Sequence, residues 1–443
     1  MKVAIVGTGI TGLSIAYQLE KKGISSVLFD TAKKVGGVLN SSQFDGFLCE
    51  KGAHTLEIKT PEVQHFINEM NLTADTFEIP SKSNRYIVHK GQLQALPLSF
   101  CSFLKTPLFS IKAKLKLLTE PFVSAYKGSD DESLGHFVTR RLGKEFLDYA
   151  IDPFVAGVYA GDPFKLSVKQ AFPKLHELEA QYGSLIKGGF LAKRKNGPRF
   201  KKRIISFRRG MHMLPEAIEK KLNSPIHLKT TLEAIEQKGD AWELTWNGQK
   251  EIFSHLIITV PAHKVKSLPW PQEISNKLSV FDQIEYAPIA TVNLGFRQQD
   301  ISGKLDGFGF LVPRKEKMNI LGTLYPSTML PNRAGKGHVL LTTFIGGSRF
   351  PEAPIMPQKA MINLVLSDLK KLFTIKGTPI FSSVKTYQKA IPQYNLGYDK
   401  ILKGMQTIED NIPGLHFAGN YRTGIAVGQC IHSAIKFASQ FKA

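Results

Sequence analysis

The N-terminal glycine-rich turn constrains the fold of this chain more than any other feature. The run KVAIVGTGITGL begins at residue 2 and spaces Gly7, Gly9 and Gly12 as GxGxxG, directly after a short β-branched strand. The first glycine permits a tight turn, the second lets backbone approach a pyrophosphate, and the third lets the next helix, expected over residues 13–22, pack closely. Asp30 ends the following strand, where its carboxylate can accept hydrogen bonds from a ribose. This order predicts a dinucleotide-binding βαβ unit.

Two further segments narrow the choice of dinucleotide. The stretch with Lys34, Gly36 and Gly37 resembles the E-x-x-x-R-x-G-G segment of flavin oxidases in the amine oxidase superfamily, with Asp30 in place of Glu and Lys34 in place of Arg. The far end carries GLHFAGN and YRTGIAVG over residues 414–428, followed by a predicted helix. Such a glycine-rich turn into a helix N-terminus suits the phosphates and ribityl chain of FAD. The resemblance implies one noncovalently bound FAD per chain.

The residues that this resemblance assigns to FAD binding come from five parts of the chain. They are Gly7, Gly9, Ile10, Thr11 and Gly12; Asp30, Lys34, Gly36 and Gly37; Gly52, Ala53, His54 and Thr55; Leu232, where backbone is expected to meet adenine; and Gly419, Asn420, Gly424, Ala426 and Val427. Two sites depart from the usual pattern: Ala53-His54 replaces Pro-Asn, and Thr423 replaces Gly. Because both departures lie by the cofactor, we expect them to affect its binding or potential.

Length and composition bound the organisation. A chain of 443 residues exceeds one hydrophobic core, so two or three domains are expected, and no long Pro, Ser or Gly linker separates them. The three cysteines are too few for a disulfide framework, and the 12 histidines form no HxxxH or HExxH pattern, so no metal site is expected. No signal-peptide pattern precedes the first strand, and no apolar run of about 18 residues occurs. These features predict a cytoplasmic protein without a transmembrane helix.

Segments in the middle of the chain point to a narrower family. Residues 153–184, 206–218, 307–313, 321–327, 330–334, 342–348 and 390–394 closely resemble segments of protoporphyrinogen oxidases. The resemblance implies FAD-dependent oxidation of protoporphyrinogen IX to protoporphyrin IX in heme synthesis, by three hydride transfers from meso carbons to flavin N5. O2, or another acceptor, would then reoxidise the flavin, and O2 would yield hydrogen peroxide. No acid–base catalyst is expected, because the protein mainly supplies orientation and a dry pocket.

The same resemblance assigns five residues to substrate binding. Arg85 occupies the position of an arginine that pairs with a substrate propionate, and a guanidinium suits a carboxylate because it forms two parallel hydrogen bonds. Leu311, Leu324 and Phe344 fall where relatives clamp the pyrrole rings, with the leucines on one side and the aromatic ring on the other. Gly157 brings bare backbone near the ring, so its carbonyl can accept a pyrrole N–H.

The motifs predict an α/β fold with interleaved domains. A Rossmann-like FAD-binding domain is expected from residues 1–80, 228–264 and 394–443. An α+β substrate domain with an antiparallel sheet is expected from residues 187–227 and 265–393, where partly alternating apolar strands occur. Residues 81–186 are expected to form a mainly helical lobe that associates with a membrane.

The net charge of +21 needs a separate account. Basic residues gather in one region: Lys112, Lys114, Lys116, Lys187, Lys193, Arg194, Lys195, Arg199, Lys201, Lys202, Arg203, Arg208 and Arg209. Apolar residues accompany them: Leu98, Phe100, Phe103, Leu104, Leu108, Phe109 and Ile111. With no nucleic-acid module present, this mixture favours peripheral binding to the anionic inner face of the cell membrane. The alternative is an ordinary solvated basic face with these apolar residues in a core.

Three functions from different classes compete. Arg85 and the Leu/Leu/Phe pattern favour oxidation of protoporphyrinogen IX. The closest enzymatic alternative is oxidation of coproporphyrinogen III, because the abundant lysines suit a substrate with four carboxylates. A non-catalytic flavin-fold binding protein is the third, and the intact glycines at both ends argue against it. The oligomeric state stays open, with a homodimer and a transient contact with the next tetrapyrrole-pathway enzyme among the alternatives.

Overall fold

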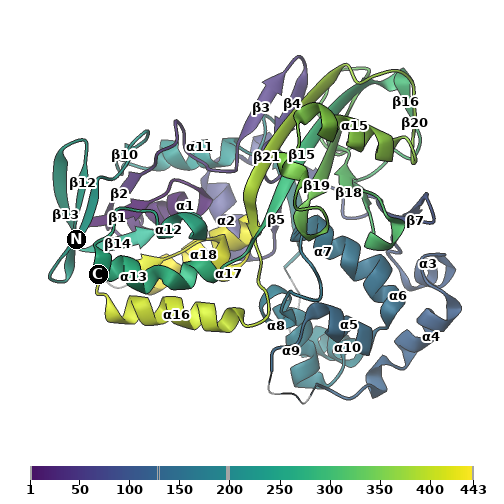
Figure 1. Ribbon diagram of the computed structural model, residues 1–443, viewed down its shortest axis with the longest axis horizontal. Helices are drawn as coiled ribbons and strands as arrows, with labels where there is room; N and C mark the ends of the chain where they lie inside the picture. The colour runs from purple at the N-terminus through teal and green to yellow at the C-terminus, as the bar shows by residue number, and fades with distance from the viewer. Residues whose placement is uncertain (1, 127, 129, 196–199, 442–443) are drawn as a thin grey trace.

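Two sheets lie side by side, and a group of helices packs below the second one (Figure 1). The computed structural model describes residues 2–126, 128, 130–195 and 200–441, with only the backbone of residues 192–195.

The first sheet has five parallel strands built from three distant parts of the chain. Its order is β10 (Ile226–His227), β2 (Ser25–Phe29), β1 (Lys2–Val6), β14 (His255–Ile258) and β22 (Leu415–Phe417). Because the strands are parallel, their carboxyl ends share one edge. Chain order reverses between β2 on one side of β1 and β14 on the other, and ligands of open α/β sheets bind at such a switch point.

Alternating side chains of the parallel sheet enter two cores. Val3 and Ile5 face a layer of four helices, whereas Ala4 and Val6 face the opposite layer. The helical layer comprises α1 (Ile10–Glu20), α2 (Pro61–Glu69), α11 (Met213–Lys221) and α18 (Val427–Gln440). The opposite layer comprises β11 (Ala234–Lys238), β12 (Ala241–Trp246), β13 (Gln249–Phe253) and α16 (Tyr398–Asn411). Both faces of the sheet are thus covered, as parallel sheets require.

The first helix begins earlier than its predicted range of residues 13–22. Gly9 has extended backbone and is the N-cap, so α1 begins at Ile10 and includes Gly12. It ends at Glu20, shortly before Gly23 with φ +75°, a left-handed conformation that favours glycine and commonly ends helices.

The second sheet has seven strands and is mixed. Its order is β21 (Phe381–Pro392), β15 (Tyr286–Arg297), β19 (His338–Gly346), β18 (Ile320–Leu324), β17 (Gly309–Leu311), β7 (Arg85–His89) and β8 (Gln92–Ala95). The strands that residues 265–393 contribute to this sheet pair antiparallel, as expected, and a parallel ladder joins β17 to β7, which was predicted to lie in the helical lobe. Helix α15 (Gln358–Leu369) packs on one face, where it shares a core with Val292 and Leu294. The predicted substrate-binding residues Arg85, Leu311, Leu324 and Phe344 lie on the other face.

The strand pairings revise two predicted domain boundaries. Strands β7 and β8 belong to the mixed sheet, so residues 85–95 do not lie in the predicted helical lobe of residues 81–186. Strand β9 (Arg203–Phe207) pairs with β5 (Leu56–Ile58) and β6 (Thr76–Ile79), and α11 packs near α1, so most of residues 187–227 lie against the FAD-binding domain.

Outside the helical lobe, the other short strands and α-helices are β3 (Ser41–Phe44), β4 (Phe47–Glu50), α12 (Ala262–Val265), α13 (Gln272–Lys277), β16 (Ile301–Ser302), α14 (Pro326–Met329), β20 (Thr374–Ile375) and α17 (Asn420–Thr423).

The helical lobe follows β8. It contains α3 (Phe100–Lys105), α4 (Ile111–Leu118), α5 (Leu134–Arg141), α6 (Lys144–Phe146), α7 (Asp152–Val158), α8 (Val168–Ala171), α9 (Pro173–Tyr182) and α10 (Leu185–Lys195). Helix α7 lies on the side of the lobe that faces the mixed sheet (Figure 1). In the described part of the chain, every helix is too short or too polar to cross a bilayer.

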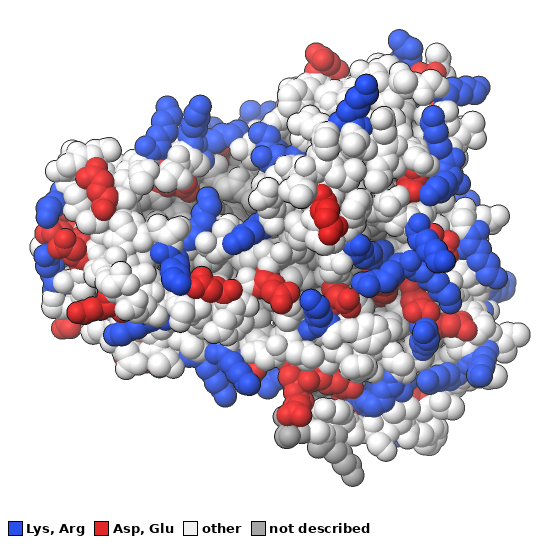
Figure 2. All heavy atoms as spheres, in the orientation of Figure 1, with Lys and Arg blue, Asp and Glu red and all other residues white. Residues whose placement is uncertain are grey.

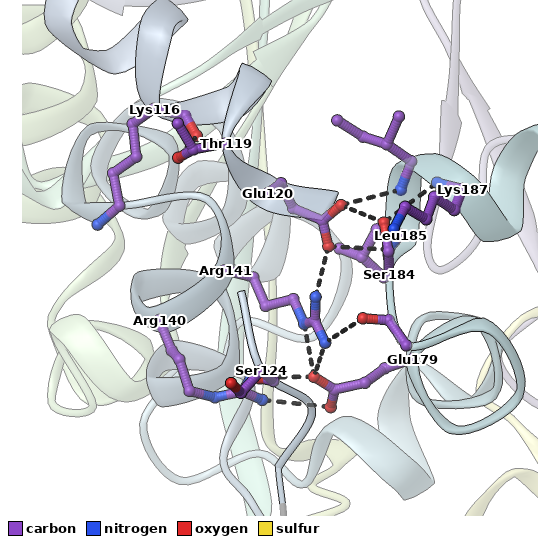
Figure 3. Close-up of polar contacts among 12 residues, drawn as sticks. Lys116, Thr119, Glu120, Ser124, Arg140, Arg141, Glu179, Ser184, Leu185 and Lys187 are labelled. Atoms are coloured by element: carbon purple, nitrogen blue, oxygen red, sulfur yellow. Dashed lines mark hydrogen bonds and ion pairs between the residues drawn. The ribbon is translucent and has the colours of Figure 1, made fainter. Parts of the chain in front are cut away.

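A buried ion cluster ties the lobe together (Figure 3). Arg141 at the end of α5 and Glu120 just after α4 are both fully buried, and their ion pair measures 2.7 Å. Glu120 also accepts hydrogen bonds from the Ser184 hydroxyl at 2.6 Å and from the backbone of Leu185 at 2.9 Å, so it caps the start of α10. Arg141 pairs in addition with Glu179 of α9. Four segments of the lobe therefore meet at one guanidinium.

Candidate functional site

The glycine turn after β1 has the geometry that its spacing predicts. Gly7 has φ +112°, a conformation that L side chains rarely adopt, and a Cβ on Gly12 would collide with the Gly7 carbonyl oxygen. Gly9 differs, because none of the described residues places a heavy atom within 4 Å of its Cβ position. Among those residues, no side chain caps the N-terminus of α1. The space beside Gly9 is thus open, with free N–H groups facing it, as an anion site requires.

Asp30 is fastened to this turn. Its carboxylate accepts hydrogen bonds from the backbone and the hydroxyl of Thr8, both at 2.7 Å, and from the Ala32 backbone at 2.9 Å. Asp30 therefore links the carboxyl ends of β1 and β2, while the Lys34 side chain is exposed. Leu232 packs with Val6 and Phe29, the last residues of these two strands.

The second glycine segment lies against the first. The backbone N–H of Gly36 donates to the Thr8 carbonyl at 2.8 Å, and Gly36 forms a parallel bridge with Gly9. Gly37 has φ +58°, and its Cβ position is 3.6 Å from the Gly9 Cα. A Cβ on Gly52 would collide with the Val38 carbonyl oxygen, which brings the stretch with Ala53, His54 and Thr55 beside the same loop.

The C-terminal glycine segment is held by two tyrosines. The Tyr394 hydroxyl donates to the Asn420 carbonyl at 2.5 Å and accepts from the Gly424 N–H at 2.8 Å. The Tyr398 hydroxyl donates to the Tyr421 carbonyl at 2.6 Å. Gly419 thus leads from β22 into a fixed turn before Ala426 and Val427 at the start of α18. Helix α18 packs against α1, and a Cβ on Gly428 would collide with the Glu57 carbonyl oxygen, so this end of the chain lies beside the other two segments.

His54 connects the cofactor segments to the mixed sheet. It is only 8% exposed, and its ring packs edge-on against Phe344 at 5.9 Å. Burial and the nearby charge of Arg333 lower the pKa of His54 to about 3, so the imidazole is neutral at neutral pH. Its Nε2 atom has no hydrogen-bond partner among the described residues. A buried orphan atom of this kind indicates that a bound group completes the site.

Arg333 is a buried charge that sequence reasoning missed. Its guanidinium, fully buried, donates to the Ser206 hydroxyl at 2.9 Å, to the Phe207 carbonyl at 3.1 Å and to Glu50 at 3.3 Å. Glu50 in turn accepts from Ser41 at 2.5 Å. The motif over residues 330–334 contained Arg333 but gave no sign of its burial.

Four of the predicted substrate residues share the open face of the mixed sheet. Gly309 of β17 lies directly opposite both Arg85 and Leu324. Gly322 of β18 lies directly opposite both Leu311 and Phe344. Paired residues and residues two apart point to one side, so all four side chains share a face. They are partly exposed, whereas Phe310 and Thr323 between them are buried on the other side.

The fifth predicted residue comes from the helical lobe. A Cβ on Gly157 of α7 would lie 2.5 Å from Leu311 Cδ2, so α7 and β17 approach as closely as glycine allows. The guanidinium of Arg85 lies over the Phe308 ring at 5.1 Å, which leaves it at the edge of the apolar face. The site therefore has apolar walls, the Arg85 cation at its rim and bare backbone at Gly157, next to the cofactor segments.

An exposed apolar groove lies at the far end of the lobe, between α3 and α4. It has a volume of about 610 Å³, and its lining includes Leu98, Phe100, Leu104, Leu115 and Leu118. Lys and Arg side chains are scattered over the same part of the surface in Figure 2. Two of the predicted membrane anchors are wrong, because Leu108 and Phe109 are buried and Phe109 stacks on Phe146 at 4.3 Å. The side chains of Lys193, Arg194, Lys195 and Arg199 lie outside the described residues.

The fold and the three converging glycine segments define an FAD-dependent oxidoreductase. The family model for flavin containing amine oxidoreductases matches residues 10–440. A mitochondrial protoporphyrinogen oxidase from Nicotiana tabacum is 34% identical over 98% of this chain and 93% of its own length. A coproporphyrinogen III oxidase from Bacillus subtilis is 26% identical over 97% of this chain and 95% of its own length. The chain belongs to the flavin-containing amine oxidoreductases and, within them, to the protoporphyrinogen oxidase family.

Solved structures agree on the fold. A protein from Exiguobacterium sp. 255-15 has a TM-score of 0.82 at 24% identity, covering 99% of this chain and 98% of its own. Putrescine oxidase bound to putrescine has a TM-score of 0.69 at 15% identity, covering 99% and 98%. The family match, rather than these structures, shows that the protein is an FAD-binding oxidoreductase, as the sequence predicted.

Proposed function

We propose that the protein oxidises protoporphyrinogen IX to protoporphyrin IX. The observation that carries the proposal is the shared sheet face, where Leu311, Leu324 and Phe344 form an apolar site beside the cofactor segments and Arg85 stands at its rim. A flat apolar macrocycle with two propionates fits such a face, because its body needs apolar walls and its carboxylates need a cation.

The roles of the residues follow from their positions. When bound at the glycine segments, FAD would supply the two-electron acceptor for each of three oxidation steps, with O2 as the terminal acceptor and hydrogen peroxide as its product. Arg85 holds a propionate, and the apolar side chains orient the ring and exclude water. The Gly157 carbonyl accepts a pyrrole N–H. His54 stays neutral beside Arg333, so it can hydrogen-bond a bound group but does not retain a proton that the substrate releases.

A steady-state assay of both porphyrinogens on one preparation tests this function. We expect a higher kcat/KM for protoporphyrinogen IX, with peroxide formed and O2 consumed. A higher kcat/KM for coproporphyrinogen III would make that compound the substrate instead. If the protein oxidises neither porphyrinogen, the proposed activity is wrong.

Coproporphyrinogen III is the second candidate, and one residue favours it. Lys385 of β21 lies opposite Thr291, which lies opposite Phe344, so Lys385 is on the same face. It stands on the other side of the apolar strip from Arg85, where the two extra propionates of this substrate would need a cation. The Lys385→Gln variant separates the two candidates. If coproporphyrinogen III is the natural substrate, the variant should weaken turnover of coproporphyrinogen III and leave turnover of protoporphyrinogen IX unchanged.

The first prediction concerns Arg85→Ala. The variant removes one charged hydrogen-bonding partner from the propionate, a loss of about 1.5–3 kcal/mol, so kcat/KM for protoporphyrinogen IX should fall roughly 10- to 150-fold. The fall should appear mainly in KM, with flavin content unchanged, because Arg85 is outside the cofactor segments. Unchanged kinetics would show that the propionate binds elsewhere.

We also propose that the α3–α4 groove binds an anionic membrane surface. Leu98, Phe100, Ile111 and Leu118 are each more than half exposed, and Lys105 and Lys112 are exposed beside them. Apolar side chains inserted below the headgroups, with lysines at headgroup level, suit peripheral binding to anionic lipid. Binding at the membrane surface would let the protein take up a poorly water-soluble porphyrinogen from the lipid.

The second prediction is that the protein sediments with phosphatidylglycerol-containing vesicles. Salt should weaken binding, because surface attraction is screened within about 8–10 Å at ordinary ionic strength. Lys105→Glu with Lys112→Glu should remove the salt-sensitive part, and Leu115→Ser with Leu118→Ser the salt-resistant part. Ile252→Ser is the matched control, because Ile252 is 58% exposed on the distant β13. Equal binding by all variants would contradict the groove as the contact.

A further inference from the structure

Helix α7, which carries Gly157, is fastened at its N-terminal end by a buried ion pair. Arg349 and Asp152 are each 9% exposed, and the guanidinium donates to the Asp152 carboxylate at 2.8 Å and to the Val312 carbonyl. The same carboxylate accepts the backbone N–H of Arg314 at 2.8 Å. Val312 directly follows β17, so this end of α7 is bound to the strand that carries Leu311.

The same short loop fastens the other end of α7. The N–H of Ser348 donates to the Ala160 carbonyl at 2.8 Å, and Ala160 has φ +50°, which is strained for a residue with a Cβ. A Cβ on Gly347 would collide with the same carbonyl oxygen. Residues 347–349 therefore hold both ends of α7, and this loop follows β19, the strand that carries Phe344.

We propose that Arg349 is a positioning residue that fixes how α7 sits on the open sheet face, and thereby the shape of the porphyrinogen site that Gly157, Leu311 and Phe344 line. The inference rests on the proposed function. It gives a role to a buried guanidinium that reaches neither the cofactor segments nor the substrate face. Because Gly157 and Leu311 are already in closest contact, loss of the Arg349 bridge lets α7 move only away from β17, which widens the site.

The test compares Arg349→Gln, Arg349→Lys and the double variant Asp152→Asn with Arg349→Gln. We expect Arg349→Gln to raise KM about tenfold while flavin content and kcat stay within about twofold, because substrate fit changes and the redox centre does not. Arg349→Lys should raise KM less than Arg349→Gln does, because it keeps a charge for Asp152. Its KM should still exceed that of the parent protein, since one ammonium cannot span Val312 and Asp152 as a guanidinium does. The double variant buries no unpaired charge, so it keeps the test valid if a single variant fails to fold.

The double variant also reports whether the two residues act as a unit. If they do, its KM resembles that of Arg349→Gln rather than exceeding it. Arg314→Gln is the matched control, because it keeps the backbone N–H that Arg314 donates to Asp152 and removes only a half-exposed guanidinium, which lies 3.8 Å from Asp152 and 3.4 Å from Asp162. A lower kcat or lower flavin content at unchanged KM would overturn the proposal, because that result marks a purely structural residue.

Binding of protoporphyrin IX, followed by quenching of its fluorescence, separates this inference from the proposed function. Turnover of neither porphyrinogen by the parent protein would refute the function. In that case about tenfold weaker porphyrin binding by the double variant still supports the positioning role of Arg349, and unchanged binding overturns it.

Discussion

The Gly9→Val variant is expected to fold, to purify without FAD and to have no oxidase activity. Gly9 has φ −67° and ψ 175°, which valine adopts readily, and no described atom lies within 4 Å of its Cβ position. The protein itself therefore tolerates the side chain. The space that valine fills is the one that a pyrophosphate needs at the N-terminus of α1. We expect loss of all bound flavin, measured as the ratio of flavin to protein absorbance.

Two other glycines serve as controls for this prediction. Gly189 also has open space at its Cβ position and no positive φ, so Gly189→Val should keep both fold and flavin. Gly12→Val should not fold, because its side chain would strike the Gly7 carbonyl. Circular dichroism separates a folded apoprotein from a misfolded one. Stoichiometric flavin in folded Gly9→Val would mean that the cofactor binds elsewhere.

The cofactor site was predictable because its signal is local. Within about thirty residues the chain forms β1, the glycine turn, α1, β2 and Asp30, and each step depends on neighbours in sequence. Gly7, Gly9 and Gly12 each have the environment that their spacing indicates. The C-terminal turn has the same character, since Gly419 and Gly424 flank a loop that leads directly into α18.

The substrate face was predictable only by resemblance. Its geometry depends on the parallel pairing of β7 with β17, strands that lie more than two hundred residues apart in sequence. No local pattern in residues 85–95 shows that partner, which is why these strands were assigned to the helical lobe. The register then places Arg85 and Leu324 on either side of Gly309, a relation that exists only in the assembled sheet.

Buried arginines were the least predictable feature. Arg141, Arg333 and Arg349 are indistinguishable in sequence from the surface cations that contribute to the charge of +21. Each is buried where distant acidic residues and carbonyl groups accept hydrogen bonds from its terminal guanidinium nitrogens. An unpaired charge could not remain there, so burial is decided by partners that the local sequence does not reveal.

The Arg141→Met variant is expected to destabilise the helical lobe by about 3–5 kcal/mol, because it leaves buried carboxylates without their cation. Burial alone would raise the pKa of Glu120, but hydrogen bonds from Ser184, Leu185 and Ile186 hold that pKa below its ordinary value. Arg141 lowers this pKa as well, but the variant keeps the other three hydrogen bonds, so most of the contacts that favour the charged form of Glu120 stay in place. Because domains are stable by only about 5–15 kcal/mol, the loss is large. Urea unfolding followed by circular dichroism measures it.

A compensated variant and a surface variant make the cause of this loss identifiable. Arg141→Met combined with Glu120→Gln and Glu179→Gln removes the uncompensated charges, so it should regain part of the lost stability even though it has fewer ion pairs. Arg203→Met breaks an ion pair with Glu78 in which the two side chains are 34% and 43% exposed, and it should cost less than about 1 kcal/mol. If Arg141→Met proves no more costly than Arg203→Met, the cluster does not hold the lobe together. If the triple variant is less stable than Arg141→Met alone, the loss comes from broken hydrogen bonds to α10 rather than from buried charge.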